Sequence, residues 1–294
     1  MVWQRRPKTH APKLGDLREL GRVSFLKQLA AGIGEHHLTA YAAALAYGAV
    51  FAVVPLIAAL VSLLGIFHAT DLVNRAIDEL RGAVPADVLS LLRTQLEQVT
   101  MTDHAGALGW GAIIAVLVAI WGVSGAMRRM MEALNVVEGS GPDPRGKVRQ
   151  YLVSIALAVG AVLLIIAALL VIVVGGGLAD RIFGVIGLGS TAATAWSVVR
   201  WPAFLLVALV GIGLLYRYAA GTRTHDNVIT PGAIFGTVGW VAFTGIFSLY
   251  VRLAGSFGAA WGAVAGVIVF LLYAQYTGTI LLIGALLDSK LKQR

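Results

Sequence analysis

Long runs of apolar residues, separated by short polar segments, make up most of the chain from residue 40 to residue 287. A helix needs about 20 residues to cross the hydrocarbon core of a bilayer, and each run is long enough to do so. The runs lie at about 40–67, 105–127, 151–179, 198–219, 230–251 and 257–287. The pattern therefore predicts an all-α integral membrane protein with six transmembrane helices.

Segments on either side of the first run carry a helical pattern of their own. Residues 68–104 repeat apolar positions at helical spacing on an acidic background, which predicts a helical cap outside the membrane. Within the basic segment 1–39, an apolar face lies opposite Lys27 and Gln28. That face consists of Val23, Leu26, Leu29, Ala30 and Ile33. We expect this amphipathic N-terminal helix to lie on the membrane surface.

The remaining boundaries follow from residues that interrupt the apolar pattern. The stretch from Arg181 to Arg200 is apolar but short and rich in Gly, Ser and Thr, which favours an interfacial or re-entrant connection. Residues 288–294 are basic again. The chain thus divides into a basic N-terminal segment (1–39), a transmembrane domain (40–287) and a basic C-terminal tail (288–294).

The composition supports a membrane protein, and the distribution of Lys and Arg predicts its topology. The chain is 58% hydrophobic and 13% charged, whereas soluble domains are about 25% charged. The net charge of +8 could indicate nucleic-acid binding, but 17 of the 23 Lys and Arg residues fall on the inner side if the N-terminus is cytoplasmic. We therefore predict cytoplasmic termini, contact with the lipid bilayer and its anionic lipids at the cytoplasmic face, and no nucleic-acid partner.

Small residues recur at every fourth position in three of the runs. This spacing lets helix backbones approach closely where lipid provides no hydrophobic drive for association. Helices joined by such faces either pack statically or slide past each other during a transport cycle. The same faces could join two copies of the chain, so a homo-oligomer stays an open alternative. The predicted packing residues are Ala40, Ala44, Gly48, Ala52, Gly232, Gly236, Gly258, Gly262 and Gly266.

The first apolar run contains features that fit either a helix with a structural role alone or a helix that lines a functional cavity. Pro55 removes one backbone hydrogen bond, so we expect the helix to kink or break there. Tyr41 and Tyr47 lie in the same run, and the deeper hydroxyl, that of Tyr47, needs a polar partner. A neighbouring helix or an aqueous cavity could supply it.

Charged residues near the ends of the runs are candidates for gating. Arg217 and Arg252 end the fourth and fifth runs, where they either snorkel to the interface or contribute to a gate. Asp226 lies beside Arg223 and His225 in a loop that is either a gate or a solvated turn. The full set of candidate cavity or gating residues is Tyr41, Tyr47, Pro55, Asn135, Arg217, Asp226, Tyr250 and Arg252.

The sequence contains no arrangement typical of catalysis or cofactor binding. It has no cysteine, and its six histidines are scattered without the spacing of helical metal pairs. Nucleotide-binding and hydrolase motifs are absent, and the apolar runs hold no central carboxylate of the kind that marks a proton-coupled pump. We therefore predict no catalytic, metal or cofactor site and no enzymatic activity.

Four strings carry a family resemblance: AYAAALAYGAVFAVVPL, MRRMMEALNVVEG, TPGAIFGTVGWVAFTGIFSLYV and WGAVAGVIVFLLYAQYTGTILLIGALL. Over about residues 25–290 the chain resembles the YihY/BrkB family of bacterial inner-membrane proteins, once labelled ribonuclease BN. Two positions depart from the family pattern. Leu286 stands where the family often has an acid, the nearest being Asp288, and Trp261 stands where the family commonly has tyrosine.

The resemblance implies a multi-pass protein of the bacterial inner membrane with a role in export or in envelope and lipid homeostasis. We expect a transporter, exporter or lipid-handling protein for an amphipathic or anionic substrate, with a cavity lined by the first, fifth and sixth helices. The alternative is a membrane scaffold that transports nothing. Ribonuclease activity is disfavoured because metal-dependent RNA hydrolysis needs clustered ligands, and His225 and Asp226 are the residues to test.

Overall fold

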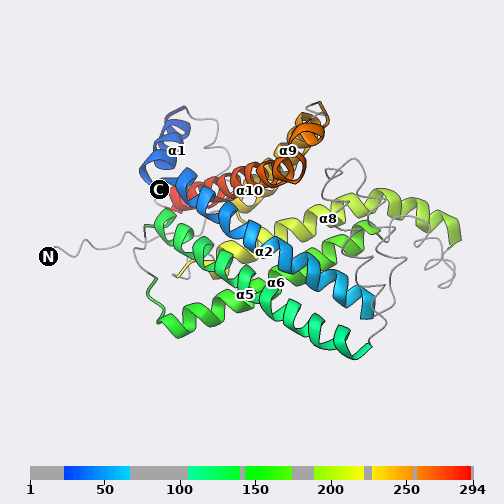
Figure 1. Cartoon of the computed structure of the whole chain (residues 1–294). Coiled ribbons are helices and arrows are strands. Elements are labelled where there is room, and N and C mark those ends of the chain that lie inside the picture. Colours follow the sequence, from blue (N-terminus) through cyan, green and yellow to red (C-terminus); the bar gives the residue numbers. More distant parts are fainter. Residues whose placement is uncertain are drawn as a thin grey trace.

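The computed structural model describes residues 23–66, 105–139, 143–173, 189–221, 227–253 and 257–292. Within these ranges the chain forms seven α-helices and no strand (Figure 1). They are α1 (Val23–Glu35), α2 (Leu38–Ile66), α5 (Ala105–Val137), α6 (Lys147–Val173), α8 (Gly189–Ala219), α9 (Pro231–Leu253) and α10 (Phe257–Lys292). The predicted all-α class is confirmed for the described part of the chain.

Four helices contain segments that are long and apolar enough to cross a membrane. They are Lys147–Ala168, Val198–Ala219, Pro231–Val251 and Gly266–Lys292, and α2 adds the shorter apolar segment Leu38–Ala52. The protein is therefore a helical, multi-pass membrane protein. Each of the six predicted runs lies on a helix where the structure describes it, but the crossing of the membrane by α2 and α5 stays a prediction. The predicted outer cap, 68–104, lies outside the described residues.

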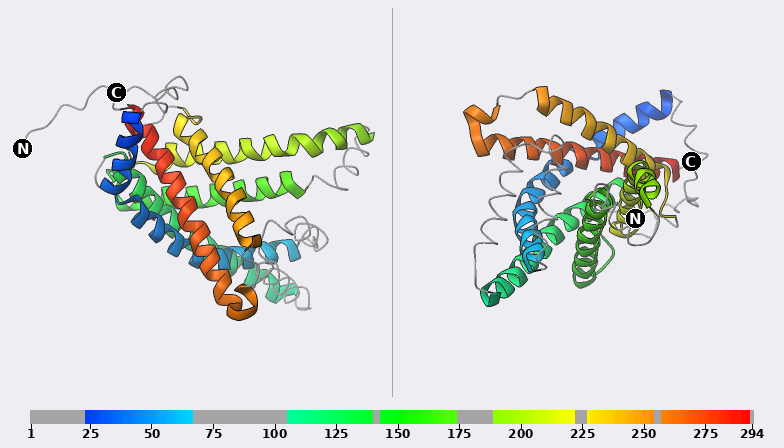
Figure 2. Two further views of the ribbon diagram at one scale, coloured as in Figure 1. Left: turned by 90° about the horizontal axis from the view of Figure 1, so that it is seen from above. Right: turned by 90° about the vertical axis from the view of Figure 1, so that its right-hand side faces the viewer.

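The helices meet at one end of the bundle and separate towards the other (Figures 1 and 2). We call the meeting place the convergent end. It comprises α1, the first turns of α2 and α9, and the last turns of α5, α8 and α10. From there α6 runs beside α8 and α9 runs beside α10 in a different direction, while α2 contacts both α5 and α10.

The largest cluster of buried apolar side chains lies at the convergent end. Its members are Phe25, Leu29, Leu38, Ala42, Met130, Met131, Ala133, Leu134, Val137, Tyr216, Ala219, Ala233, Leu282, Ala285, Leu286, Leu287 and Leu291. Elsewhere large apolar side chains are exposed, as Trp121, Leu163 and Ile246 show. The convergent end is thus packed like the core of a soluble protein, whereas the rest presents the apolar surface that lipid requires.

α1 packs against other helices through part of its apolar face, and its expected position on the membrane surface stays a prediction. Phe25 and Leu29 are buried in the cluster at the convergent end. Gly32 approaches α10 so closely that a Cβ there would lie 3.0 Å from Cδ2 of Leu286. The apolar face of an amphipathic helix can be covered by lipid or by protein, and here protein covers Phe25 and Leu29 while Ala30 is exposed.

Two predicted boundaries also differ from the structure. α10 continues to Lys292, and Asp288 and Lys292 are buried, so residues 288–292 are not a basic tail. α8 begins at Gly189, so residues 189–200 are the first turns of this helix rather than a separate connection. Residues 181–188 lie outside the described ranges. Small or polar residues at the edge of an apolar run do not stop a helix when its backbone hydrogen bonds can continue.

The contact of α2 with α10 uses a different alanine from those predicted. Ala40 and Ala44 are exposed, whereas Ala42 is buried. Ala42 faces Gly278 of α10, where a Cβ would lie 3.5 Å from both Cα and Cβ of Ala42. Ala40 and Ala44 therefore take no part in the contact with α10, and their predicted packing role stays a prediction.

The other two predicted positions on α2 face α5. A Cβ on Gly122 of α5 would lie 3.3 Å from Cα of Ala52, so the two backbones nearly touch. Gly48 lies beneath the guanidinium of Arg129, and a Cβ there would be 3.5 Å from Cζ and closer still to Nη1. The lack of a side chain at Gly48 thus makes room for an arginine.

The structure describes only some of the other features that were predicted for the apolar runs. α2 is one continuous helix through Pro55, so it does not break there. Gly266 is partly exposed on α10. The side-chain surroundings of Gly258 and Gly262 lie outside the description, so their packing role stays a prediction.

Candidate functional site

The start of α9 is capped by its own sequence. The hydroxyl of Thr230 accepts a hydrogen bond from the backbone N–H of Ala233 at 3.1 Å, and the carbonyl of Thr230 accepts one from Ile234 at 3.0 Å. Thr230 is therefore the N-cap. Pro231 takes the first helical position, where the N–H that it lacks would have no partner within the helix.

A carboxylate from another helix completes this cap. Asp288 of α10 is fully buried, and it accepts hydrogen bonds from the backbone N–H of Gly232 at 2.7 Å and from the hydroxyl of Thr230 at 2.5 Å. The helix dipole favours a negative charge at this position, and charge-assisted hydrogen bonds are stronger than neutral ones. Asp288 therefore ties α9 to α10.

Two glycines let α9 and α10 come this close. A Cβ on Gly232 would lie 2.6 Å from Cγ of Asp288 and closer still to the carbonyl oxygen of Gly284. A Cβ on Gly284 would lie 2.6 Å from the carbonyl oxygen of Gly232. Because the opposing atoms include backbone, neither position can take a side chain without moving a helix.

Tyr216 joins α8 to the same contact. Its side chain is buried, and its hydroxyl donates a hydrogen bond to the carbonyl oxygen of Leu281 in α10. A Cβ on Gly236 of α9 would lie 3.0 Å from this hydroxyl oxygen. Helices α8, α9 and α10 therefore meet around one tyrosine.

A buried ion pair extends the contact to α5. The Nζ of Lys292 donates to Oε1 of Glu138 at 3.3 Å, and each side chain is only 6% exposed. Lys292 follows Asp288 by four residues on α10, so the two share a helix face and interact electrostatically. We use the name polar cluster for these five residues: Tyr216, Thr230, Asp288, Glu138 and Lys292.

The end of α8 is held by an amide from α5. Asn135 is buried, and its Oδ1 accepts a hydrogen bond from the backbone N–H of Gly221 at 2.6 Å. Its Nδ2 is buried without a hydrogen-bond partner among the described residues. Asn135 therefore connects α5 to the chain that leaves α8.

The last carbonyls of α8 are also capped from the segment before α6. The guanidinium of Arg145 donates to the carbonyl oxygens of Tyr218 at 3.0 Å and Ala219 at 2.7 Å. It also forms an ion pair with Asp143, with 2.7 Å between Nη2 and Oδ2. Burial acts to raise the pKa of Asp143, but the hydrogen bonds and charge of Arg145 outweigh it and hold that pKa below its ordinary value.

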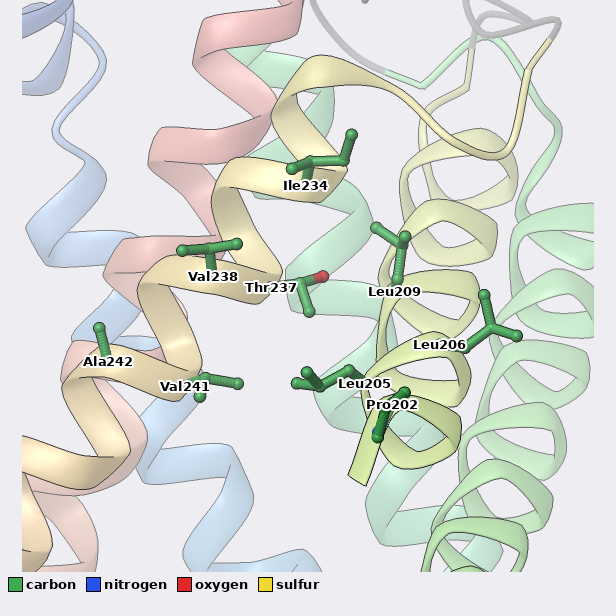
Figure 3. A pocket seen from close by; sticks show the side chains of 9 residues that line it. All are labelled: Pro202, Leu205, Leu206, Leu209, Ile234, Thr237, Val238, Val241 and Ala242. Carbon is green, nitrogen blue, oxygen red and sulfur yellow. The ribbon is translucent and has the colours of Figure 1, made fainter. Parts of the chain in front are cut away.

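A groove opens where α8 and α9 separate from each other (Figure 3). Its volume is about 570 Å³. It is lined by Pro202, Leu205, Leu206, Leu209, Ile234, Thr237, Val238, Val241 and Ala242. The hydroxyl of Thr237 donates to the carbonyl oxygen of Ala233, so even this polar side chain is satisfied within α9. The groove therefore suits hydrocarbon rather than a polar solute.

Comparison with known proteins decides the family. The family model described as virulence factor BrkB matches residues 29–294. The chain belongs to the BrkB family. A curated relative from Bacillus subtilis (strain 168), named putative ribonuclease-like protein YfkH, is 27% identical over 276 residues, or 92% of this chain and 96% of the relative. No solved structure matches the chain. The resemblance drawn from the sequence strings is thereby confirmed.

In this BrkB-family chain the described candidate gating residues do not gather in one place. Tyr41 packs against the cluster at the convergent end, and Asn135 belongs to that cluster's polar surroundings. Tyr47 and Tyr250 are 59% and 51% exposed. Neither of these two tyrosines lines the groove between α8 and α9.

The charged candidates divide between the described and undescribed parts of the chain. Arg217 lies near the end of α8, with its Cζ 5.6 Å from the ring centre of Tyr218. Asp226 and the side chain of Arg252 lie outside the described residues. A gating role for these three residues stays a prediction.

Sequence reasoning does not identify the polar cluster. It assigns Asp288 to a tail and finds no carboxylate within the apolar runs, whereas α10 buries Asp288 against the start of α9. Two signals are present in the sequence. Thr230 followed by Pro231 reads as a helix start, and Asp288 and Lys292 have the i, i+4 spacing of a helical ion pair. Neither signal indicates that the two helix ends meet.

Proposed function

We propose that this BrkB-family protein moves or handles an amphipathic, lipid-like substrate within the membrane. The groove between α8 and α9 carries the proposal, because its lining offers apolar contacts and no unsatisfied polar side chain. Both helices are long and apolar enough to span a bilayer, so hydrocarbon can reach the groove from the side. The groove pairs the fifth helix, α9, with the fourth, α8, and the expected cavity between the first, fifth and sixth helices stays a prediction.

The polar cluster supports a closed state of the convergent end. Tyr216, Asp288 and Lys292 join α8, α9, α10 and α5 through buried hydrogen bonds and an ion pair. A substrate that passes beyond the groove would have to separate these contacts. The arrangement therefore fits a protein that is open to lipid between α8 and α9 and closed at the convergent end.

The distribution of positive charge supports an orientation in a bacterial inner membrane with the convergent end in the cytoplasm. Arg145 caps the end of α8 at this end, and Lys147 and Arg149 follow it in the first turn of α6. Cytoplasmic segments of membrane proteins carry an excess of Lys and Arg. The same residues would attract anionic lipid headgroups.

A role without catalysis fits the contacts of the buried acids. Both oxygens of Asp288 accept hydrogen bonds from α9 and its cap, and Glu138 is paired with Lys292. These carboxylates therefore serve the packing of helices. RNA cleavage by the purified protein that is lost in His225→Ala and Asp226→Ala variants would contradict this part of the proposal.

Lipid movement in reconstituted vesicles tests the proposal. We expect a fluorescent phosphatidylglycerol to cross between leaflets faster in proteoliposomes than in protein-free vesicles. Val238→Trp, which fills the groove, should slow this movement, whereas Ile246→Trp at an exposed position elsewhere on α9 should not. If folded protein moves no lipid with or without a pH gradient, the transport proposal fails and the scaffold alternative takes its place.

A further inference from the structure

Two adjacent arginines lie where the apolar part of α5 ends. Arg128 and Arg129 directly follow the predicted apolar run 105–127. Arg129 faces α2, where a Cβ on Gly48 would lie 3.5 Å from Cζ of this arginine. Arg128 faces α6, where its Cζ lies 5.0 Å from the ring centre of Tyr151. One guanidinium group therefore lies on the α2 side of α5 and the other on the α6 side.

Both arginine side chains point back along α5 towards its apolar part. A Cβ on Gly125, three residues before Arg128, would lie 3.8 Å from Nη2 of this arginine. The Cβ on Gly48 that would contact the guanidinium of Arg129 would also lie 3.8 Å from Cα of Ala126, three residues before that arginine. Side chains on a helix lean in this direction. An arginine that only snorkels to water at this end would instead turn towards the convergent end.

Neither arginine is neutralised by a carboxylate within the part of the chain that the structure describes. Glu132 follows Arg128 by four residues and Arg129 by three, and both spacings permit a helical ion pair. Glu132 is nevertheless exposed, and no ion pair joins it to either arginine. Charged side chains near the hydrocarbon core of a membrane are stabilised by a partner of opposite charge. The two guanidinium groups therefore suit an anion from outside the chain.

The face of α5 between the two arginines has room for such an anion. Gly125 precedes them by three and four residues, so it lies on the helix face between them. Apart from the backbone of α5 itself, Nη2 of Arg128 is the only atom of the described residues within 4 Å of a Cβ at Gly125. Trp121 lies one turn nearer the apolar part and is 67% exposed. A phosphate over Gly125 would thus have a guanidinium on either side and an apolar surface next to it.

We infer that Arg128 and Arg129 bind the phosphate of an anionic phospholipid over Gly125, with an acyl chain of that lipid beside Trp121. Guanidinium groups donate paired hydrogen bonds to phosphate oxygens. Phosphatidylglycerol brings a net negative charge to the two arginines, whereas the ammonium group of phosphatidylcholine would cancel the charge of its phosphate. The site lies on α5, apart from the groove between α8 and α9, and it binds lipid whether or not the protein moves lipid.

Native mass spectrometry of the full chain in detergent tests this inference. Dioleoyl phosphatidylglycerol and dioleoyl phosphatidylcholine are added in separate titrations, so only the headgroup differs. We expect the wild type to retain phosphatidylglycerol more strongly, and Arg128→Gln and Arg129→Gln each to reduce that retention about tenfold. Arg217→Gln is the matched control and should change retention little. Arg217 also lies over a tyrosine ring, with 5.6 Å from its Cζ to the ring centre of Tyr218, but its neighbours in the sequence are tyrosines instead of a second arginine.

A glycine substitution tests the same site without a change of charge. In Gly125→Leu the new side chain would fill the space between the two guanidinium groups, so retention of phosphatidylglycerol should fall. Gly160→Leu on α6 is the control, because a Cβ at Gly160 also has room, with no atom within 4 Å. Equal retention in the two leucine variants, or equal losses in Arg128→Gln and Arg217→Gln, would overturn the inference.

A water-soluble phosphate ester distinguishes a lipid from a free phosphate. Glycerol 3-phosphate at the same concentration should leave phosphatidylglycerol bound, because it has no acyl chain. Displacement of the lipid would mean that a soluble phosphate ester fills the site, and the lipid assignment would be wrong. Circular dichroism identifies a variant that fails to fold. Arg129 lies in the contact of α2 with α5, whereas Arg128 and Gly125 lie outside it, so their variants decide if Arg129→Gln unfolds. Retention requires no lipid movement, so it can succeed when the flux test of the proposed function fails.

Discussion

α8 and α9 meet in two contrasting ways along their length. At the convergent end they are joined through Tyr216, Gly236 and the capped start of α9, where the hydroxyl of Tyr216 and the N–H of Gly232 each have a hydrogen-bond partner on α10. In the groove they present leucine and valine side chains that remain exposed. In lipid, apolar contact with a second helix is little better than contact with a lipid tail. Polar caps and glycine contacts therefore hold these helices together, and the apolar stretch between them is free to open.

Gly232→Ala should produce the largest loss of stability, because it attacks the closest backbone contact of the convergent end. The added methyl group would overlap the carbonyl of Gly284 and the carboxylate of Asp288. We expect the free energy of unfolding to fall by about 3 kcal/mol. Thermal unfolding of the purified protein in detergent measures the change.

Gly245→Ala on the same helix is the control for this variant. A Cβ at Gly245 meets no atom within 4 Å, so the methyl group has room. We expect stability to stay equal or to rise by less than about 1 kcal/mol, since alanine is the better helix former. Similar losses in both variants would mean that the contact with Gly284 does not hold α9 and α10 together.

Asp288→Ala should rank second, since it removes the carboxylate that caps α9 and leaves the N–H of Gly232 buried without this acceptor. We expect a loss of about 2 kcal/mol, with Asp288→Asn losing less because its carbonyl oxygen can still accept one hydrogen bond. Glu132→Ala, at an exposed position on α5, controls for the removal of a carboxylate. Equal unfolding temperatures for the two alanine variants would contradict the capping role.

The helices could be predicted from the sequence because length and hydropathy are local properties. The runs at 198–219 and 230–251 coincide with the apolar segments of α8 and α9. Thr230 and Pro231 mark the start of α9 for the same reason, since a cap depends on its own few residues. The class of fold therefore follows from the sequence.

The site could not be predicted, because its parts are far apart in the chain. Asp288 and Gly232 are separated by 56 positions, and their contact depends on the crossing of two backbones at Gly232 and Gly284. The amphipathic pattern of α1 likewise fits lipid or protein equally well, so the burial of Phe25 and Leu29 against other helices could not be predicted from it. The exposure of Tyr47 and Tyr250 could not be predicted either, since their place in an apolar run does not tell which side chains a neighbouring helix covers.

The ion pair between Lys292 and Glu138 should show a smaller effect, best measured as a coupling. Removal of one partner leaves the other as a buried charge, while removal of both leaves none. In a double-mutant cycle of Lys292→Gln and Glu138→Gln, we expect a coupling energy of about 1 to 2 kcal/mol. Additive losses would show that α5 and α10 are not joined through this pair.

The smallest expected effect is a dependence of stability on pH. It should appear at the convergent end and should be absent from the groove between α8 and α9. The pKa of Asp143 is held below its ordinary value of 3.8 by Arg145, so the unfolded chain binds this proton more readily than the folded protein does. The stabilisation is present above that value and is lost as the pH falls through the folded pKa. Asp143→Asn should therefore lower the free energy of unfolding at about pH 7 by less than about 1 kcal/mol, measured as a lower unfolding temperature. At about pH 3 the same substitution should change the stability less. Val238→Trp replaces one uncharged groove residue by another, so its effect on the unfolding temperature should not depend on pH. A pH-independent effect of Asp143→Asn would mean that charge does not hold the segment before α6 against the end of α8.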